Sequence, residues 1–330
     1  ASDVYKRQMV DITMEILKLK PVFKDYIWGG TRLHTDYGFE TGFDKTAEGW
    51  MLACHKDGMN TIDGGVFDKM TLQEVIDKEG LEKIGGKNCL KFPYFPVLIK
   101  IIDAYDNLSI QVHPDDEYAR RVENEFGKTE IWYVLDATDD AKLIYGFKNE
   151  ITKDEFRKSI EDNTLLDKLN VVNVKKGDLF FIEAGTVHAI GKGALIAEIQ
   201  QNSNCTYRVY DYGRVGKDGK PRELHIDKAV DVSNTIPPKY DIKPMGGEIE
   251  SNGNISQLLT KCDLFTVDRY QITSDITLTA DEDSFNHILV TDGNGEIDGK
   301  PAKKGDSYFV PAGYGDYTVK GDIEIIVTRV

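Results

Sequence analysis

The sequence predicts a mainly β protein built from two related barrels, with a few helices inserted between the strands. Short apolar runs bounded by turn residues recur along the chain, and such runs are typical of strands in a sandwich or a barrel. Four runs show this pattern most clearly, at 95–103, 130–135, 142–145 and 178–182. Stretches with helical signals are fewer, so we expect the helices to decorate a β core.

Three stretches carry the start signals of helices. Two of them begin with a threonine that precedes a glutamate by three residues, the pattern of a capping box, and they predict helices over 71–83 and 152–161. The third helix is predicted over 115–126, with one of the two aspartates at its start as the N-cap and Gly127 as the stop.

An internal repeat indicates that there are two barrels. Residues 177–188 and 305–316 both run through a Gly-Asp turn, an apolar strand and an Ala-Gly turn. Two copies of one β unit imply two related domains. We expect the first domain to span 9–239 and the second 240–330, after the Pro237–Pro238 linker.

The composition excludes several classes of protein. The net charge is −15, and the chain has no basic stripe of the kind that neutralises nucleic-acid phosphates. No run approaches the roughly 18 apolar residues of a membrane span. The four cysteines are far apart and form no Cys-x-x-Cys pair, which is typical of reduced thiols in the cytoplasm. Residues 1–8 precede a methionine and lack apolar periodicity, so we interpret them as a non-native leader.

Four side chains form a candidate metal site: Gln111, His113, Glu130 and His188. Gln111 and His113 flank a valine in a segment of alternating apolar positions, so both point to one face of an extended strand. Glu130 precedes an apolar strand and His188 follows a Gly-Thr turn, and strand ends beside turns are where a barrel opens. An amide oxygen, a carboxylate and two imidazoles suit a borderline divalent cation such as Zn²⁺.

Each member of this set also has a simpler interpretation. A histidine in a β-rich chain is more often a hydrogen-bonded core or surface residue than a metal ligand. The combination of all four residues near strand ends favours the metal. In the second copy of the repeat, Asp316 takes the place of His188 and the only nearby histidine is His287. We therefore expect the second barrel to be metal-free, with a structural or lid-supporting role.

Four sequence blocks surround these candidates: Leu108-Ser-Ile-Gln-Val-His-Pro114, Lys128-Thr-Glu130, Ala184-Gly-Thr-Val-His188-Ala, and Glu198-Ile-Gln-Gln-Asn-Ser203 continuing to Tyr207-Arg208. Together they resemble the type I mannose-6-phosphate isomerase (phosphomannose isomerase) family, in the short form typical of Firmicutes. The resemblance covers nearly the whole chain. The Gln-Val-His-Pro block and the Arg208 block together are highly specific, whereas the Ala-Gly-Thr-x-His turn alone occurs in many cupins.

This resemblance implies a cupin (jelly-roll) fold and one Zn²⁺ per chain, held at the positions of the four candidate ligands. It also implies an essential arginine, which matches Arg208. Two departures from the family pattern concern the pocket. The family usually has Glu-x-Trp-Glu-x-Ser where this chain has Glu48-Gly-Trp-Met-Leu-Ala53, and it has a proline at the position of Glu183.

Interconverting an aldose and a ketose requires moving a proton between C1 and C2, most simply through a cis-enediol. The developing oxyanion needs a positive neighbour, and Arg208 is our candidate because a guanidinium stays charged at any working pH. The alternative for Arg208 is a surface ion pair with Asp211 or Glu198. The candidate proton carrier is Lys128, two residues from Glu130 and hence on the same strand face, with Glu198 and a metal-bound water as rivals.

Two further residues are candidates for binding the substrate phosphate. Ser109 and Lys100 belong to strands that lead into and form the metal site, with Arg208 close by. Lysine supplies a charge and serine a hydrogen-bond donor. Both residues could equally be solvated positions of the barrel.

We therefore predict a cytoplasmic, Zn²⁺-dependent isomerase that interconverts D-mannose 6-phosphate and D-fructose 6-phosphate. The expected partner is the sugar phosphate, without nucleic acid or membrane, and the chain is expected to be a monomer or a weak homodimer. Two alternatives stay open. One is another metal cupin enzyme, such as an iron-dependent oxygenase or a cupin-type glucose-6-phosphate isomerase, although amide ligation by Gln111 suits a redox-inert site. The other is a non-catalytic sugar-binding cupin.

Overall fold

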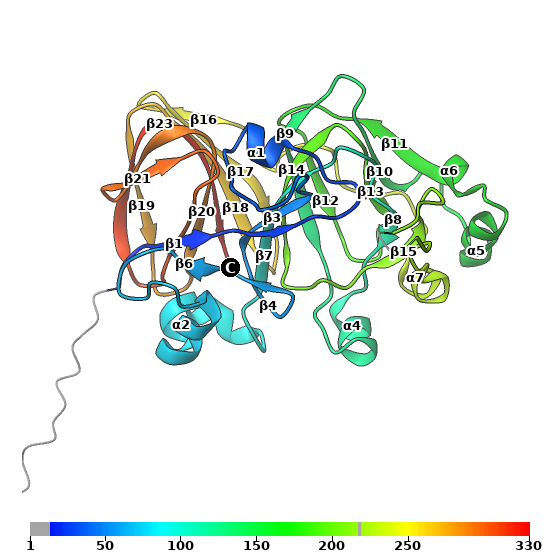
Figure 1. Cartoon of the computed structure of the whole chain (residues 1–330), viewed down its shortest axis with the longest axis horizontal. Helices are drawn as coiled ribbons and strands as arrows, with labels where there is room; N and C mark the ends of the chain where they lie inside the picture. The colour runs from blue at the N-terminus through cyan, green and yellow to red at the C-terminus, as the bar shows by residue number, and fades with distance from the viewer. Residues whose placement is uncertain (1–13, 217–218) are drawn as a thin grey trace, which may run out of the picture.

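The computed structural model describes residues 14–216 and 219–330 and confirms that the chain is mainly β. Its strands form three large sheets and one short hairpin (Figure 1). None of the helices in these ranges is long and apolar enough to cross a membrane. The predicted leader, residues 1–8, lies outside the described residues.

Two sheets form the amino-terminal part of the fold. The six-stranded sheet has the order β12 (Leu179–Ile182), β9 (Glu130–Ala137), β14 (Ala194–Gln201), β7 (Val97–Asp103), β3 (Glu48–Leu52) and β2 (Val22–Lys24). The five-stranded sheet has the order β11 (Leu169–Asn173), β10 (Lys142–Phe147), β13 (His188–Ile190), β8 (Ile110–Val112) and β15 (Tyr207–Tyr210). The four strand runs predicted from the sequence are confirmed as β7, β9, β10 and β12.

The carboxy-terminal part is a ten-stranded sheet. Its main path is β16 (Ile249–Ser251), β17 (Asn254–Lys261), β18 (Thr266–Ile272), β23 (Gly315–Arg329), β20 (Asn286–Ile297), β22 (Ser307–Val310), β1 (Leu17–Lys20) and β6 (Thr61–Ile62). In addition, β19 (Asp275–Ala280) pairs with β23 and β21 (Lys300–Lys303) pairs with β20. The hairpin of β4 (Cys54–His55) and β5 (Gly58–Met59) stands apart.

Two strands from the start of the chain complete this carboxy-terminal sheet. β1 pairs with β22, with Leu17 opposite Phe309, and β6 pairs with the other edge of β1. The domain boundary that we expected near residue 240 does not anticipate this pairing, because nothing in the sequence of β1 indicates which sheet it joins.

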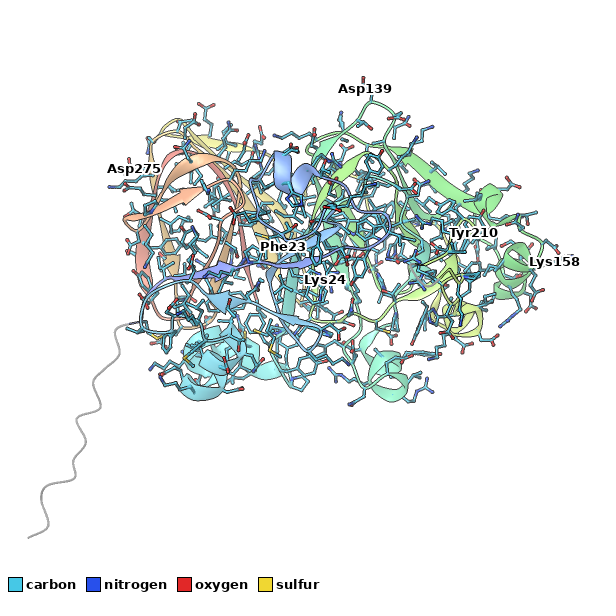
Figure 2. The ribbon with its side chains drawn as sticks, viewed as in Figure 1. Phe23, Lys24, Asp139, Lys158, Tyr210 and Asp275 are labelled. Carbon is cyan, nitrogen blue, oxygen red and sulfur yellow. The ribbon has the colours of Figure 1, made fainter. Side chains whose placement is uncertain are left out.

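The six-stranded sheet is buried on both faces. Ile99 and Ile101 of β7 pack in one apolar cluster with Val267 and Ile326 of the ten-stranded sheet. Ile102, on the opposite face, belongs to a second cluster that fills the space between the six-stranded and five-stranded sheets. This double burial explains why apolar residues occupy both faces of β7, although Lys100 lies among them. Figure 2 shows side chains filling the molecule between Asp275 in the ten-stranded sheet at one end and Tyr210 in the five-stranded sheet toward the other.

Helices cover the outer surfaces of the sheets. α5 (Lys153–Glu161), α6 (Leu165–Lys168) and α7 (Ile226–Val232) pack in one apolar cluster with the outer face of the five-stranded sheet. α2 (Leu72–Glu79) and α3 (Leu81–Gly85) contribute to the cluster at the junction of the two parts. The remaining helical elements are α1 (Arg32–Thr35), the 3₁₀ helix η1 (Lys87–Lys91) and α4 (Asp116–Val122).

The helix starts were predicted correctly, but two helix ends were wrong. The capping boxes at Thr71 and Thr152 both form, and the carboxylate of Asp115 caps α4 by accepting from the Tyr118 N–H. The predicted helix 71–83 is interrupted at Gly80, whose φ of +99° is incompatible with a helix, so it forms α2 and α3. The helix predicted to reach Phe126 ends at Val122, because Asn124 adopts φ +55° before Gly127 is reached.

The internal repeat has a backbone cause. The first glycine of each copy, Gly177 and Gly305, has φ near +90°, and the glycine of each Ala-Gly turn, Gly185 and Gly313, also has a positive φ. These are conformations that residues with a side chain rarely adopt. The strand between the two turns is β12 in the first copy and β22 in the second. The repeated sequence therefore encodes the same turn, strand and turn in both parts of the molecule.

Gly86 provides a test of the junction between the parts. It has φ +91°, and an added Cβ would lie 2.5 Å from the Asp283 carbonyl oxygen, whereas a Cβ at Gly80 would meet no atom within 4 Å. Gly80→Ala is expected to lower the free energy of unfolding by about 1 kcal/mol through backbone strain alone. Gly86→Ala adds a clash and is expected to cost about 1–3 kcal/mol more. Equal losses in urea unfolding of the two variants would contradict this packing.

Candidate metal centre and active site

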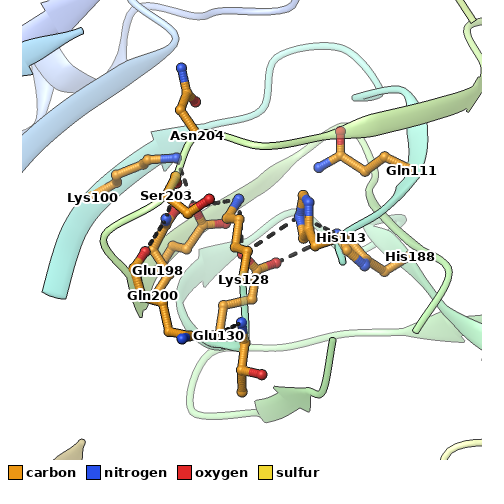
Figure 3. Close-up of polar contacts among 12 residues, drawn as sticks. Lys100, Gln111, His113, Lys128, Glu130, His188, Glu198, Gln200, Ser203 and Asn204 are labelled. Carbon is orange, nitrogen blue, oxygen red and sulfur yellow. Dashed lines mark hydrogen bonds and ion pairs between the residues drawn. The ribbon is translucent and has the colours of Figure 1, made fainter. Parts of the chain in front are cut away.

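Three buried side chains converge where strands begin or end. His113 directly follows β8, Glu130 is the first residue of β9 and His188 is the first residue of β13. All three are at most 1% exposed, and their ligating atoms lie within 4.8 Å of one another. Figure 3 shows the two imidazoles and the carboxylate facing one another. The predicted convergence at strand ends is confirmed for these residues.

Hydrogen bonds fix the tautomer of each imidazole. Nδ1 of His113 lies 2.9 Å from the Cys205 carbonyl oxygen, and Nδ1 of His188 lies 2.8 Å from the Thr186 carbonyl oxygen. A carbonyl oxygen only accepts, so each Nδ1 carries the proton and each Nε2 is left with a lone pair. The two Nε2 atoms are 3.1 Å apart, and each faces a Glu130 oxygen, at 3.8 and 3.5 Å. Two imidazole lone pairs and a carboxylate that converge in this way fit a cation.

The charges of these three groups also fit a metal site. Burial and then the positive charge of Lys128 lower the pKa of His113, and burial lowers the pKa of His188 to about 4. Both imidazoles are therefore neutral at pH 7, as metal ligation requires. Neither carboxylate oxygen of Glu130 accepts a well-aligned hydrogen bond from a described residue, although Lys128 Nζ lies 3.0 Å away. Burial, followed by the nearby Glu198 carboxylate, raises the pKa of Glu130.

Gln111 lies beside this trio. In the strand register it is opposite both His188 and Arg208, and Figure 3 shows its amide next to the imidazoles. Its Oε1 accepts from the Ser109 hydroxyl at 3.3 Å. The place of Gln111 in the register fits the predicted fourth ligand, which stays a prediction.

A cavity of about 260 Å³ opens next to the trio. Gln111 and Lys128 belong to its wall and connect it with the ligand residues. The cavity is lined by Tyr26, Trp28, Glu48, Lys100, Ile102, Leu108, Ser109, Gln111, Lys128, Ile190, Glu198, Asn204, Thr206, Arg208 and Arg222. Its wall is mostly polar, so a hydroxylated and charged ligand suits it better than an apolar one.

The inner wall of the cavity is a chain of buried charges. Lys100 Nζ lies 3.0 Å from one oxygen of Glu198 and 3.7 Å from Glu48, and Lys128 Nζ lies 3.7 Å from the same Glu198 oxygen. The Trp132 indole N–H donates to the other Glu198 oxygen at 2.9 Å. Burial alone would raise the pKa of Glu198, but the two lysines outweigh it and lower this pKa, so Glu198 stays ionised.

Arg208 lies on β15 at the opposite side of the cavity. Its Nε donates to the Ser109 hydroxyl at 3.3 Å and its Nη1 to the Glu223 carbonyl oxygen at 2.8 Å. Within residues 14–216 and 219–330 it forms no ion pair with Asp211 or Glu198, which was the alternative expected from the sequence. Asp211 is instead paired with Arg214 and Arg222.

Comparison with known proteins places the chain in a family. Residues 16–144 match the family model for the type I phosphomannose isomerase catalytic domain, and residues 254–330 match the one for the mannose-6-phosphate isomerase cupin domain. Mannose-6-phosphate isomerase ManA of Bacillus subtilis is 40% identical over 329 residues, which cover 96% of this chain and 100% of that protein. The chain belongs to the type I phosphomannose isomerase family.

Two other relatives agree with this assignment. Mannose-6-phosphate isomerase of Streptococcus mutans is 36% identical, over 96% of this chain and 98% of that protein. The crystal structure of the mannose 6-phosphate isomerase from Bacillus subtilis superposes with a TM-score of 0.87 at 35% identity, over 96% of this chain and 99% of that chain. The family resemblance and the cupin fold expected from the sequence are therefore confirmed.

We expected nine site residues from the sequence, and the structure brings all nine together. His113, Glu130 and His188 form the trio, and the cavity wall contains Lys100, Ser109, Gln111, Lys128, Glu198 and Arg208. Sequence reasoning missed Trp132, which holds Glu198, and Arg222, which lines the cavity. No motif marks either residue, because each acts through a neighbour that only the fold supplies.

The two departures from the family pattern have visible consequences. Glu48 is held in the cavity wall although the second acid and the serine of the family pattern are absent. The Trp50 indole N–H donates to it at 2.7 Å, and Lys100 lies nearby. Glu183, which replaces a proline, pairs with Lys239 at 3.0 Å, far along the chain in the segment that leads to the second part. Neither departure touches the trio.

Removing either imidazole is expected to abolish metal binding. His113→Ala and His188→Ala each delete one of three converging ligands, so bound metal measured by elemental analysis is expected to fall to near background. His287→Ala is the matched control, since His287 is equally buried but bonds Ser307 in the ten-stranded sheet at 2.8 Å. If His113→Ala or His188→Ala keeps its full metal content and only the His287→Ala control loses metal, this centre is ruled out.

Proposed function

We propose that this chain is a Zn²⁺-dependent isomerase that interconverts D-mannose 6-phosphate and D-fructose 6-phosphate. One observation carries the proposal. Two neutral imidazoles and a buried carboxylate without a well-aligned donor converge beside a cavity whose wall holds two lysines and two arginines. The relatives named mannose-6-phosphate isomerase over nearly the full chain support the substrate.

The ligand set favours zinc among the common divalent cations. Imidazole nitrogen suits a borderline metal better than Mg²⁺ or Ca²⁺, which prefer oxygen. The predicted fourth ligand, the Gln111 amide, suits a site without redox chemistry. When bound, Zn²⁺ would act as a Lewis acid toward the oxygens on C1 and C2 of the sugar.

The proton transfer is assigned to Lys128. Its Nζ lies in the cavity wall, beside the trio, and is within 3.0 Å of Glu130 and 3.7 Å of Glu198. After giving up its ammonium proton, Lys128 would take the proton from C2 of the aldose and return it to C1, while the hydroxyl proton on O2 passes to O1. The two transfers together give the ketose with no net change in protons. Glu198 is less suited to this task, because Lys100 and Trp132 occupy its oxygens and the lysines lower its pKa, which makes this carboxylate a weak base.

The phosphate is assigned to the side of the cavity that holds Ser109 and Arg208. Lys100 was also a candidate, but its charge is matched by Glu198 and Glu48. In our proposal Lys100 therefore contributes mainly by holding Glu198, and Arg208 supplies the charge that stabilises an oxyanion or a phosphate.

The second part of the molecule is proposed to lack a metal. Strand β22 repeats β12, and the register places Asn286 opposite Val310 just as Glu130 is opposite Ile182. In the same way, Asp316 is opposite Thr279 where His188 is opposite Gln111. The counterparts of these ligands thus contain no imidazole, and the Asn286 amide donates to the Thr279 carbonyl oxygen and to the Tyr317 hydroxyl.

Four further properties complete the proposal. The chain acts in the cytoplasm, since its cysteines are free thiols. It does not bind nucleic acid, since its net charge is −15 and its sequence has no basic stripe. It works as a monomer or a weak homodimer. Its partner is the sugar phosphate.

A turnover assay tests the function and the metal together. The purified protein is expected to interconvert mannose 6-phosphate and fructose 6-phosphate, to lose this activity to a chelator and to regain it with Zn²⁺. Free mannose is expected to be a far poorer substrate, because each charge-assisted hydrogen bond to phosphate contributes about 1.5–3 kcal/mol. Full activity in a metal-free preparation, or equal efficiency on free mannose, would refute the proposal.

Arg208 is expected to be separable from the metal. Arg208→Ala removes a charge that faces the cavity but ligates nothing, so near-stoichiometric zinc and cooperative unfolding are expected to persist while kcat/KM falls by about 10²-fold or more. Arg208→Lys is expected to recover little, since a point charge cannot replace the planar fork of donors. Zinc content, melting and rate are measured on the same preparations, and a near wild-type rate would remove Arg208 from the mechanism.

A further inference from the structure

A second arginine lines the cavity beside Arg208 and has no role in the reaction described above. Arg222 is held by a two-pronged ion pair: its Nε donates to one oxygen of Asp211 at 2.7 Å and its Nη2 to the other at 2.5 Å. Asp211 is itself only 6% exposed, and Arg214 donates to it from another side at 2.6 Å. A planar guanidinium held through two nitrogens has a fixed direction.

The backbone ties the two arginines together. Arg208 Nη1 donates to the carbonyl oxygen of Glu223, the residue that follows Arg222, at 2.8 Å. The His225 N–H donates to the Arg208 carbonyl oxygen at 2.8 Å. The segment that carries Arg222 therefore runs beside β15, and both guanidinium groups reach the same cavity.

Each guanidinium keeps one nitrogen for a ligand. The bonds to Asp211 use Nε and Nη2 of Arg222, and the bonds to Ser109 and Glu223 use Nε and Nη1 of Arg208. Among the described residues, nothing accepts from Arg222 Nη1 or from Arg208 Nη2. These two groups present several N–H donors and positive charge to the cavity.

The balance of charge differs between the two ends of the cavity. At the inner end, Lys100 and Lys128 are matched by Glu48, Glu130 and Glu198. At the arginine end, Arg214 and Arg222 share the single buried carboxylate of Asp211, and Arg214 also lies 3.7 Å from the exposed carboxylate of Asp106. Arg208 has no carboxylate partner within the described ranges. A dianion is therefore stabilised at the arginine end and repelled by the carboxylates at the inner end.

We propose that Arg222 is a second phosphate-binding residue, which grips the sugar phosphate together with Arg208 and Ser109. In this arrangement Asp211 is a positioning residue that aims Arg222 at the phosphate. The assignment rests on the proposed function, because it takes the substrate to be a phosphorylated sugar. It also gives the substrate a direction in the cavity, with the phosphate at the arginine end and C1 and C2 toward Lys128 and the trio.

The decisive variant is Arg222→Ala, assayed as the zinc-loaded full chain. KM for mannose 6-phosphate is expected to rise about 10-fold to 100-fold, the loss of one charge-assisted contact, with a smaller change in kcat. The inhibition constant of inorganic phosphate is expected to weaken by a similar factor, and the preference for phosphorylated over free mannose to fall. Arg222→Lys is expected to restore part of the affinity. Arg157→Ala, which removes an arginine from an exposed pair with Asp227, is the control and is expected to change none of these values.

Asp211→Asn tests the positioning role. The variant keeps the size of the side chain but weakens the clamp, so KM is expected to rise less than in Arg222→Ala. In the Arg222→Ala background the same change is expected to alter KM by less than about 2-fold, because its target is gone. Fully additive effects would show that Asp211 acts in some other way.

The outcomes separate this inference from the proposed function. If the wild-type chain turns over mannose 6-phosphate and Arg222→Ala keeps its KM and its sensitivity to inorganic phosphate, the role of Arg222 is refuted while the function stands. If the wild-type chain has no activity on mannose 6-phosphate yet binds inorganic phosphate in an Arg222-dependent manner, the anion site stands and the proposed function fails. A loss of zinc or of cooperative unfolding in Arg222→Ala would mean that Arg222 is structural, and would overturn the proposal.

Discussion

The burial of Glu130 between two neutral imidazoles is the constraint on which the rest of the site depends. An ionised carboxylate taken out of water is costly unless a positive charge lies against it. Lys128 supplies part of that charge at 3.0 Å, but neither carboxylate oxygen gains a well-aligned hydrogen bond from a described residue. The carbonyl oxygens of Cys205 and Thr186 keep both imidazoles in the tautomer that turns lone pairs toward the carboxylate. The geometry therefore fits a bound metal cation, which no side chain of the protein supplies.

The same need for charge matching divides the cavity. Glu198 is placed between Lys100 and Lys128, so the lysines nearest the trio are neutralised by buried acids. The arginines across the cavity share one buried acid, Asp211. In a chain with a net charge of −15, this local group of cations supports the phosphate site that we propose. A sugar phosphate, with a dianion at one end and the reacting carbonyl and hydroxyl groups at the other, would match both halves of this division.

The sequence predicts the strands better than it predicts helix ends or contacts between residues far apart in the chain. The strands β7, β9, β10 and β12 could be predicted from short apolar runs, and the trio from short motifs at strand ends, because both signals depend on neighbours in the chain. The Asp211–Arg222 clamp could not be predicted, since its two residues are not neighbours in the chain and no motif marks either of them. For the same reason the pairing of β1 with β22 was missed. The predicted helix ends were wrong where a single residue, Gly80 or Asn124, adopts a positive φ.

The two copies of the repeat separate what the fold requires from what the chemistry requires. Both copies keep the positive-φ glycines and the apolar strand between them, so these features serve the backbone. Where the first copy has Glu130, the second has Asn286, whose amide donors are satisfied by Thr279 and Tyr317 without any ion. A buried amide with its hydrogen bonds made costs little, whereas a buried carboxylate is tolerated only with a partner. In our proposal, the second copy therefore needs no metal at this place, whereas Glu130 and the imidazoles of the first copy are there to hold a cation.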